Sequence, residues 1–376
     1  MRVDVVDPSA FTPPYDHALC TALARAGADV RLQTSRFGYG PVPAAAGYER
    51  VERFYRRMSI PIRPGAGGGI GSRARFAAKL VQHVPDMLAY RRAAAAADVV
   101  HFQWLTVQPV DVHLLPRARP VVLTAHDVLP REPRRGQLAA QRRLYGQVDA
   151  IVVHSEHGRE RLVDGLGIAA DKVTVIAHGA FTHLLGVPGE RALPAELAAV
   201  DKPVVLFFGL LRPYKGLDVL LDAWRAADLD AELWIVGMPR MDVAPLRAAA
   251  PAGVRWVSRF VADDEVAAYF RRADLVVLPY REIDQSGVLF TALAFGAPLV
   301  LSAVGGFPEV AGDGAAALVA PGDVAALAGE LQRLLADDAA RARLAAGARA
   351  AAAGRYSWDA IAAAHLALYE TLRRCT

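Results

Sequence analysis

The feature of this sequence that most constrains its fold is a series of short, nearly unbroken apolar runs rich in valine, isoleucine and leucine. Segments with helical periodicity separate most of them, as at 216–227 and 263–272. Strands that are apolar on both faces are typical of parallel sheets covered by helices, and their alternation with helices indicates right-handed βαβ units. We therefore expect an α/β protein with doubly wound sheets. The expected strands are 3–6, 30–33, 99–102, 121–124, 151–153, 173–176, 204–208, 233–236, 254–257, 275–278, 299–301 and 317–319.

A stretch rich in proline and glycine, residues 186–203, divides these strands into two sets. A chain of 376 residues is long enough for two domains. We expect one domain at 1–190 and another at 191–357, with a terminal helix at 358–376 that packs back on the first. Because ligands bind at the carboxyl ends of strands in such sheets, functional residues are expected there.

Several classes of protein are excluded by composition. No apolar run reaches the roughly 18 residues of a membrane span, and residues 1–7 predict a strand, not a signal peptide. The two cysteines, Cys20 and Cys375, have no metal-like spacing. We expect a cytoplasmic protein without a metal site.

Residues 50–92 are strongly basic. They contain ten arginine or lysine residues against two acidic ones, a local charge of +8 in a chain whose formal charge is +4. Such a field favours an anionic partner, and we expect peripheral contact with an anionic membrane surface. The alternative is a solvated basic helix face. Nucleic acid is not expected, because the region has no reading motif and no interleaved aromatic residues.

The most informative segment begins where the expected strand 204–208 ends. Gly209 follows the strand, and Arg212 and Lys215 precede an expected helix. Glycine allows close approach to the backbone, and two cations beside a helix N-terminus suit a diphosphate. The alternative is a basic loop in solvent. We expect a second part of this diphosphate site in the backbone N–H groups at the start of another helix, formed by Ser286, Gly287, Val288 and Leu289.

These segments resemble the group 1 (family 4) retaining glycosyltransferases. The resemblance is close over the second half of the chain and looser over the first. It implies the GT-B fold, in which two Rossmann-like domains face each other across a cleft. It also implies a nucleotide-diphosphate sugar as co-substrate, with UDP or GDP, and no other cofactor. Phe260 and Val261 then lie beside the nucleotide base. The resemblance rests on Phe208–Gly209, Arg212, Lys215–Gly216 and segments 220–223, 232–237, 257–261, 265–269, 273–279, 295–300, 305–310 and 318–323, which follow the family's order.

The chain departs from the family at two positions. Members usually carry two glutamates eight residues apart, and Ile283 and Thr291 stand at the matching places. In the family, the first glutamate contacts the donor sugar and the second contacts the ribose. We expect Asp284, or alternatively Glu282, to take the first role as a catalytic residue. Thr291 is the weaker substitute for the second.

In the first half, the expected strand 121–124 ends at His126 and Asp127. His126 resembles the family's strand-end histidine beside the donor sugar, and we expect it to be catalytic through hydrogen bonding or charge stabilisation. Asp127 is expected to cap the following turn, and the alternative is that it orients His126. His101 and His154 end neighbouring strands, where core or capping roles are the default.

Where the family often has a Gly-Gly loop, this chain has Tyr15, Asp16 and His17. These three residues are expected on the acceptor side, and the alternative is an ordinary helix N-cap at Asp16. The function expected is that of a retaining glycosyltransferase acting on a hydroxyl acceptor. The alternatives are a non-catalytic descendant that binds nucleotide or carbohydrate, or a pseudoglycosyltransferase or phosphorylase on the same scaffold.

Overall fold

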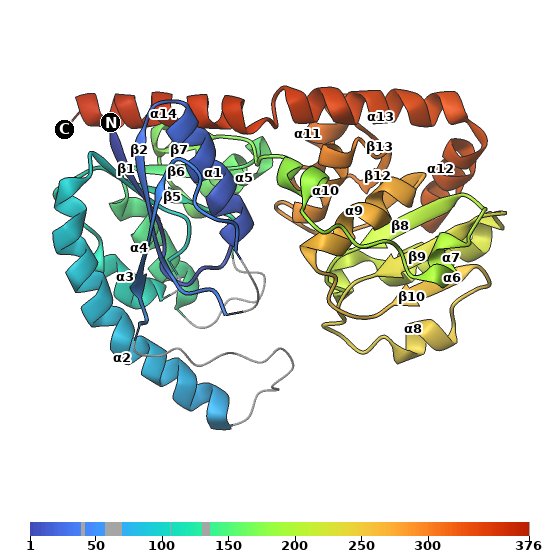
Figure 1. Cartoon of the computed structure of the whole chain (residues 1–376), viewed down its shortest axis with the longest axis horizontal. Helices are drawn as coiled ribbons and strands as arrows, with labels where there is room; N and C mark the ends of the chain where they lie inside the picture. Colours follow the sequence, from blue (N-terminus) through green and yellow to red (C-terminus); the bar gives the residue numbers. More distant parts are fainter. Residues whose placement is uncertain (39–41, 57–69, 106, 130–135, 376) are drawn as a thin grey trace. The chain divides into compact units, whose positions relative to one another are not determined.

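The computed structural model describes residues 1–38, 42–56, 70–105, 107–129 and 136–375, with the backbone alone for 70–80. The chain forms two compact units, Met1–Ala177 with Trp358–Thr376 and His178–Ser357. Each unit contains one parallel sheet (Figure 1). The division lies before residue 178, not after residue 190, because the backbone beyond Ala177 is bonded into the second unit. The Ala180 N–H donates to the Tyr356 carbonyl, and the Phe181 N–H donates to the Phe290 carbonyl.

The first sheet has the strand order β3-β2-β1-β4-β5-β6-β7. Chain order reverses between β1 and β4, which is where such sheets bind ligands. All six strands expected in this unit are confirmed, whereas β3 was not expected, because its sequence is polar and it pairs with β2 alone. The strands are β1 (Arg2–Asp7), β2 (Asp29–Ser35), β3 (Glu49–Phe54), β4 (Val99–Phe102), β5 (Val121–Thr124), β6 (Ala150–Val153) and β7 (Val173–Val175).

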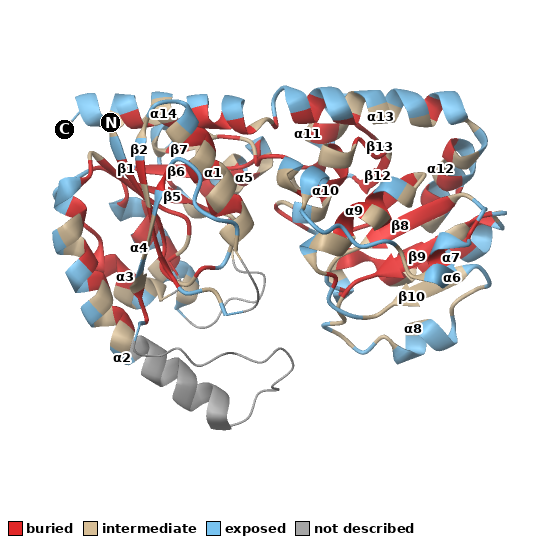
Figure 2. Ribbon diagram, in the orientation of Figure 1, coloured by how far each residue is buried: buried red, intermediate tan, exposed pale blue. Residues whose placement is uncertain are grey.

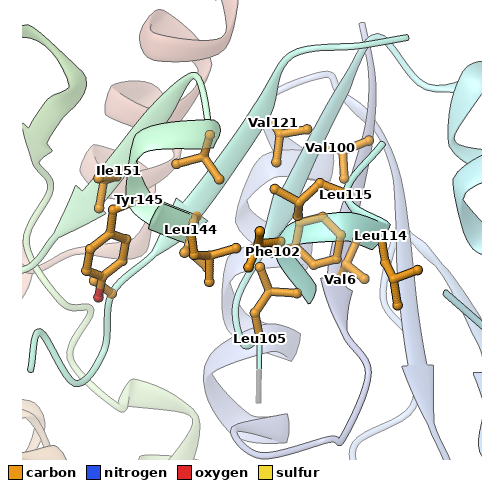
Figure 3. Close-up of a cluster of buried hydrophobic side chains, with 14 of the residues drawn as sticks. Val6, Val100, Phe102, Leu105, Leu114, Leu115, Val121, Leu144, Tyr145 and Ile151 are labelled. Carbon is orange, nitrogen blue, oxygen red and sulfur yellow. The ribbon is translucent and has the colours of Figure 1, made fainter. Parts of the chain in front are cut away.

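Helices cover both faces of this sheet. On one face α1 packs against α14. On the other face, side chains of α2 to α5 share one hydrophobic cluster with the strands. Figure 3 shows part of that cluster, with Phe102 of β4 among Leu105, Leu114 and Leu144. The helices are α1 (Pro13–Arg25), α2 (Ile70–Ala93), α3 (Gln108–Leu114), α4 (Gln137–Gln147), α5 (Glu156–Leu166) and α14 (Trp358–Arg374), with short 3-10 turns η1 (Ala94–Ala96) and η2 (Ala170–Lys172).

The second sheet has the order β10-β9-β8-β11-β12-β13, with its reversal between β8 and β11. All six strands expected here are confirmed. They are β8 (Val204–Phe208), β9 (Glu232–Val236), β10 (Val254–Val257), β11 (Leu275–Leu278), β12 (Leu299–Ser302) and β13 (Ala316–Val319). Figure 2 shows that the central strands of this unit are buried along most of their length.

In the second unit α7 packs against α12, and α9 packs against α10. The expected helices at 216–227 and 263–272 are confirmed as α7 and α9. The helical elements are η3 (Thr182–Gly186), α6 (Ala195–Ala198), η4 (Pro213–Lys215), α7 (Leu217–Ala227), α8 (Ala244–Ala248), α9 (Asp263–Arg272), α10 (Gly287–Phe295), α11 (Phe307–Gly312), α12 (Val324–Ala336) and α13 (Asp338–Ala353).

The basic region 50–92 falls partly outside the described residues, which omit 57–69 and the side chains of 70–80. Two of its arginines act within the fold. The Arg50 guanidinium donates to the Pro43 carbonyl at 2.6 Å, and Arg53 donates to Gln33 Oε1 at 2.7 Å. These contacts give the expected membrane association no support. None of the helices in the described part of the chain combines the length and the apolar character needed to cross a membrane.

Candidate functional site

The loop after β8 brings several of the expected residues together. Gly209 has φ of 104°, and a Cβ at this position would lie 2.9 Å from Val288 Cγ2 and 3.1 Å from Lys215 Nζ. The turn thus meets both the expected cationic loop and the start of α10. Gly237, at the end of β9, is equally constrained, because a Cβ there would lie 1.8 Å from the Gly209 carbonyl oxygen. Close backbone contact between two glycines shapes this edge of the sheet.

Lys215 is buried, with 6% of its surface exposed. Its Nζ lies 4.9 Å from the centre of the Tyr280 ring, a cation–π distance. The Tyr280 hydroxyl is 3.4 Å from Ser286 Oγ. A lysine ammonium held at a glycine turn is a point charge suited to a phosphate oxygen.

Arg212, by contrast, is exposed, and its side chain forms no hydrogen bond or ion pair with any residue that the structure describes. The nearby Arg281 is engaged, because its Nη1 lies 2.8 Å from Asp218 Oδ1. Arg212 therefore has its guanidinium available for a bidentate anion, and Arg281 does not.

At the start of α10, Ser286 is the N-cap residue, as expected. The Leu289 N–H is not available to a ligand, because it donates to the Ser286 carbonyl at 3.0 Å. Within the described chain, the N–H groups of Gly287 and Val288 make no backbone hydrogen bond. Of the backbone N–H groups expected to bind the diphosphate at this helix, those of Gly287 and Val288 are therefore the available donors.

The residues at the family's glutamate positions have distinct environments. Asp284 is buried with 5% exposure, its carbonyl accepts the Gly306 N–H at 3.3 Å, and Glu282 is exposed. Ile283 is buried. The Thr291 hydroxyl donates to the Gly287 carbonyl at 2.9 Å, so only its lone pairs remain for another group.

The expected base-side residues differ in exposure. Phe260 is 62% exposed and Val261 is 9% exposed. An ion pair between Arg259 and Glu265, 2.6 Å from Nη2 to Oε1, holds the loop that carries them. An exposed aromatic face on a fixed loop can stack on a planar base.

In the first unit, the strand-end histidines form one hydrogen-bonded chain. His126 Nε2 lies 3.1 Å from Gln103 Oε1, and His126 Nδ1 lies 3.2 Å from His154 Nε2. His154 Nδ1 lies 3.0 Å from the Ile176 carbonyl oxygen. On the other side, Gln103 Nε2 lies 3.3 Å from Nε2 of His101. The carboxyl ends of four neighbouring strands, β4 to β7, are thereby linked.

The proton positions in this series of hydrogen bonds follow from the groups at its two ends, the Ile176 carbonyl and the Gln103 amide. The Ile176 carbonyl can only accept, so His154 Nδ1 carries a hydrogen. Burial lowers the pKa of His154 to about 4, so the ring is neutral and its Nε2 accepts a hydrogen from His126 Nδ1. The other ring nitrogen, His126 Nε2, contacts the side-chain amide of Gln103, which can present either its oxygen or its NH₂ group.

His101 is a buried core residue, as its default role predicted. Its Nδ1 lies 2.5 Å from the Tyr369 hydroxyl of α14, and its Nε2 lies 2.7 Å from Thr124 Oγ1. Burial lowers the pKa of His101 well below its usual value. This histidine connects α14 to the strand-end chain.

Tyr15 and Asp16 are buried, with 1% exposure each, and the structure corrects the expectation that they face a ligand. The Tyr15 ring packs edge-on against His126 at 4.8 Å. The alternative of an N-cap at Asp16 is also wrong, because α1 begins at Pro13 and Thr12 is its N-cap. His17 is half-buried, with Nδ1 at 2.9 Å from the Tyr48 hydroxyl.

Comparison with known proteins shows which family the chain is similar to. A model described as "Glycosyl transferases group 1" matches residues 202–337, and one described as "Glycosyltransferase Family 4" matches residues 15–184. The chain is 31% identical to a D-inositol 3-phosphate glycosyltransferase of Xylanimonas cellulosilytica, over 94% of this chain and 90% of that protein. The chain belongs to the group 1, family 4 glycosyltransferases. A relative of the same name from Corynebacterium glutamicum is 28% identical, with the same coverage.

Solved structures confirm the GT-B fold for this glycosyltransferase. Sucrose-phosphate synthase from Thermosynechococcus elongatus has a TM-score of 0.78 and 22% identity, and the match covers 100% of both chains. Anabaena HepE in complex with UDP has a TM-score of 0.72 and 18% identity, covering 99% of this chain and 100% of that one. The two doubly wound sheets of the glycosyltransferase are the two Rossmann-like halves of that fold.

Sequence reasoning missed Gln103, Trp104 and Phe11. Gln103 and Trp104 follow β4 directly, just as Ala125 and His126 follow β5. The same rule that singled out His126 would have found them. Among the described residues of the glycosyltransferase, no group of three or more histidine, cysteine or acidic side chains is arranged to hold a metal ion.

Proposed function

We propose that this glycosyltransferase moves a sugar from a nucleotide-diphosphate sugar to a hydroxyl group, with retention of configuration at the anomeric carbon. The observation that carries the proposal is the meeting of Gly209, buried Lys215 and the open N–H groups of Gly287 and Val288. Together they offer an ammonium and backbone donors to one diphosphate. Exposed Arg212 adds a guanidinium that can grip two oxygens.

Catalysis in this scheme depends on position and charge. As the bond between the anomeric carbon and the diphosphate oxygen breaks, negative charge grows on the leaving phosphate, where Lys215 and the α10 donors stabilise it. The acceptor hydroxyl attacks from the same face of the sugar, and its proton passes to the leaving phosphate oxygen. Asp284 is the side chain proposed for the donor sugar hydroxyls, with Glu282 as the alternative. Thr291 is proposed to accept from the ribose.

His126 is proposed to lie beside the transferred sugar. Because His154 engages Nδ1, a sugar hydroxyl reaches this ring only at Nε2, in place of Gln103. A protonated His126 donates there and stabilises growing negative charge. For the base, we propose UDP over GDP, with Phe260 stacked on it. The support is that HepE, a protein of the same fold, has been solved with UDP and with UDP-glucose.

The test is thermal unfolding of the full chain with UDP, GDP, ADP, TDP and inorganic phosphate. A nucleotide at about 100 times its Kd adds about 2.7 kcal/mol to the free energy of unfolding. We expect UDP to raise the Tm of the wild type and of Arg281→Ala, the matched control whose cation is paired with Asp218. The Tm of Lys215→Ala should not respond, and that of Arg212→Ala should respond less.

Two results would contradict the proposal. Stabilisation of the folded protein by inorganic phosphate and by no nucleotide would indicate a phosphorylase. An equal response of Lys215→Ala and Arg281→Ala would remove Lys215 from the diphosphate site. Retention is checked separately, by the anomeric configuration of the product in its NMR spectrum.

A further inference from the structure

The loop between β1 and α1 has no backbone donor left for a ligand. The Phe11 and Thr12 N–H groups donate to Asp7 Oδ2 at 2.5 and 3.2 Å, and the Ser9 N–H donates to Asp7 Oδ1 at 3.2 Å. The Ala10 N–H donates to the Asp7 carbonyl at 3.2 Å. The remaining positions are prolines, which have no N–H: Pro8, Pro13 and Pro14. Every N–H from residue 8 to residue 14 is therefore accounted for.

In doubly wound sheets this loop and the following helix N-terminus commonly bind a phosphate. Here the Asp7 carboxylate occupies the position of that anion. The Asp16 carboxyl group donates a hydrogen bond to Asp7. Burial raises the pKa of Asp16 well above its usual value, and the Asp7 charge raises it further. The two carboxyl groups lie together under the loop, and burial raises the pKa of Asp7 as well. A phosphate would find no free backbone N–H among residues 8–14 and would meet two acidic side chains beneath them.

What the loop presents instead is aromatic. Phe11 is 54% exposed, and its ring centre lies 5.3 Å from that of Trp104. Trp104 stacks on His126, with the centroids 5.0 Å apart and the planes 15° apart. Trp104 Nε1 donates to Thr12 Oγ1 at 2.9 Å, which fixes the indole against the loop. The stack lies at the carboxyl ends of β1, β4 and β5, where the strand order reverses.

We propose that Phe11 and Trp104 form the platform for the acceptor, and that this acceptor is a neutral hydroxylated ring with no phosphate at this loop. Aromatic faces pack against the C–H face of a sugar or cyclitol ring, whose hydroxyls point outward to other partners. The inference rests on the proposed function for the identity of the ligand as acceptor. A neutral acceptor would distinguish this chain from relatives whose name specifies D-inositol 3-phosphate, a phosphorylated ring.

The experiment is saturation-transfer NMR on the full chain with matched pairs of probes, glucose with glucose 6-phosphate and myo-inositol with D-inositol 3-phosphate. We expect a neutral ring to bind the wild type about tenfold more tightly than its phosphorylated partner. Phe11→Ala should raise the Kd of that ring about fivefold. Leu88→Ala, which removes another exposed apolar side chain of this unit, should leave it unchanged.

Three outcomes would overturn the inference. The first is tighter binding of the phosphorylated partner, and the second is equal binding of the neutral ring by Phe11→Ala and the wild type. The third is no binding of either neutral ring at a probe concentration of about 10⁻¹ M. Trp104→Phe, which keeps an aromatic face, guards against a folding defect and should retain most of the affinity. The response of Tm to UDP is measured on the same samples. A normal UDP response with a failed ring test rejects the platform and leaves the proposed function standing.

Discussion

The two sheets have the same architecture but opposite chemistry at their ligand-binding edges. In the first, buried polar side chains belong to the strands and their ends, including Asp4, Asp7, His101 and Gln103, each with 0% exposure. In the second, β8 and β11 are apolar throughout, and the edge is shaped by backbone at Gly209 and Gly237. The first sheet holds polar side chains in place through a hydrogen-bonded network. In the second sheet, glycines without side chains let backbone groups approach one another closely.

This difference predicts different vulnerabilities. A network of buried polar groups is sensitive to the loss of a partner and to pH, because each unpaired buried group costs free energy. A tight glycine contact is sensitive to one added methyl group and insensitive to pH.

The largest effect is expected in the second sheet, from Gly237→Ala. Gly237 has φ of +147°, and the new Cβ would lie 1.8 Å from the Gly209 carbonyl oxygen. We expect a loss of about 3 kcal/mol or more in the free energy of unfolding, measured by urea denaturation. The matched control is Gly329→Ala in α12, where a Cβ meets nothing within 4 Å. It should gain about 0.5–1 kcal/mol, and similar losses in both variants would contradict the contact.

A slightly smaller effect is expected in the first sheet, from Asp7→Ala. It leaves the N–H groups of Ser9, Phe11 and Thr12 without their acceptor in a partly buried loop. We expect a loss of about 2–3 kcal/mol in the free energy of unfolding. Asp29→Ala is the control, because Asp29 forms an exposed ion pair with Arg2 and its loss should matter little. If the two variants were equally stable, the loop would not depend on the carboxylate.

The smallest effect is a pH dependence confined to the first sheet. His365 of α14 is buried, its Nδ1 donates to the Ile361 carbonyl, and burial lowers its pKa to about 4. The unfolded chain takes up a proton as pH falls below about 6.5 and the folded chain does not, so this histidine lowers stability between about pH 6.5 and pH 4.

His365→Leu should therefore be more stable than the wild type at pH 5, by about 2 kcal/mol, and differ little at pH 7.5. Guanidinium titrations at the two pH values measure it, with the exposed His113→Leu as control. A stability difference that did not change with pH would show that His365 titrates normally in the fold. Buried carboxyl groups such as Asp16 act in the opposite direction, so the comparison is made between variant and wild type.

Much of this architecture could be read from residue order. The strand runs and the helices predicted at 216–227 and 263–272 follow from the local hydrophobic pattern. The placement of Gly209, Lys215 and Ser286 at the ends of elements follows from turn chemistry. The family resemblance rests on the same segments. The strand β3 was not predicted because its sequence is mostly charged and lacks a strand periodicity, so that it forms a strand only through pairing with β2.

The sequence by itself determined two doubly wound sheets and the chain positions of the cationic loop and the strand-end histidines, because periodicity and turn residues act over a few neighbouring positions. Only the tertiary structure decided which of these groups meet. The proximity of Gly209 to Val288 depends on β8 lying beside β11, and that of Gln103 to His126 on β4 lying beside β5. The Asp7 carboxylate could equally have faced solvent. Its capture by the loop N–H groups reflects burial, which makes an unbonded donor costly and so selects one arrangement.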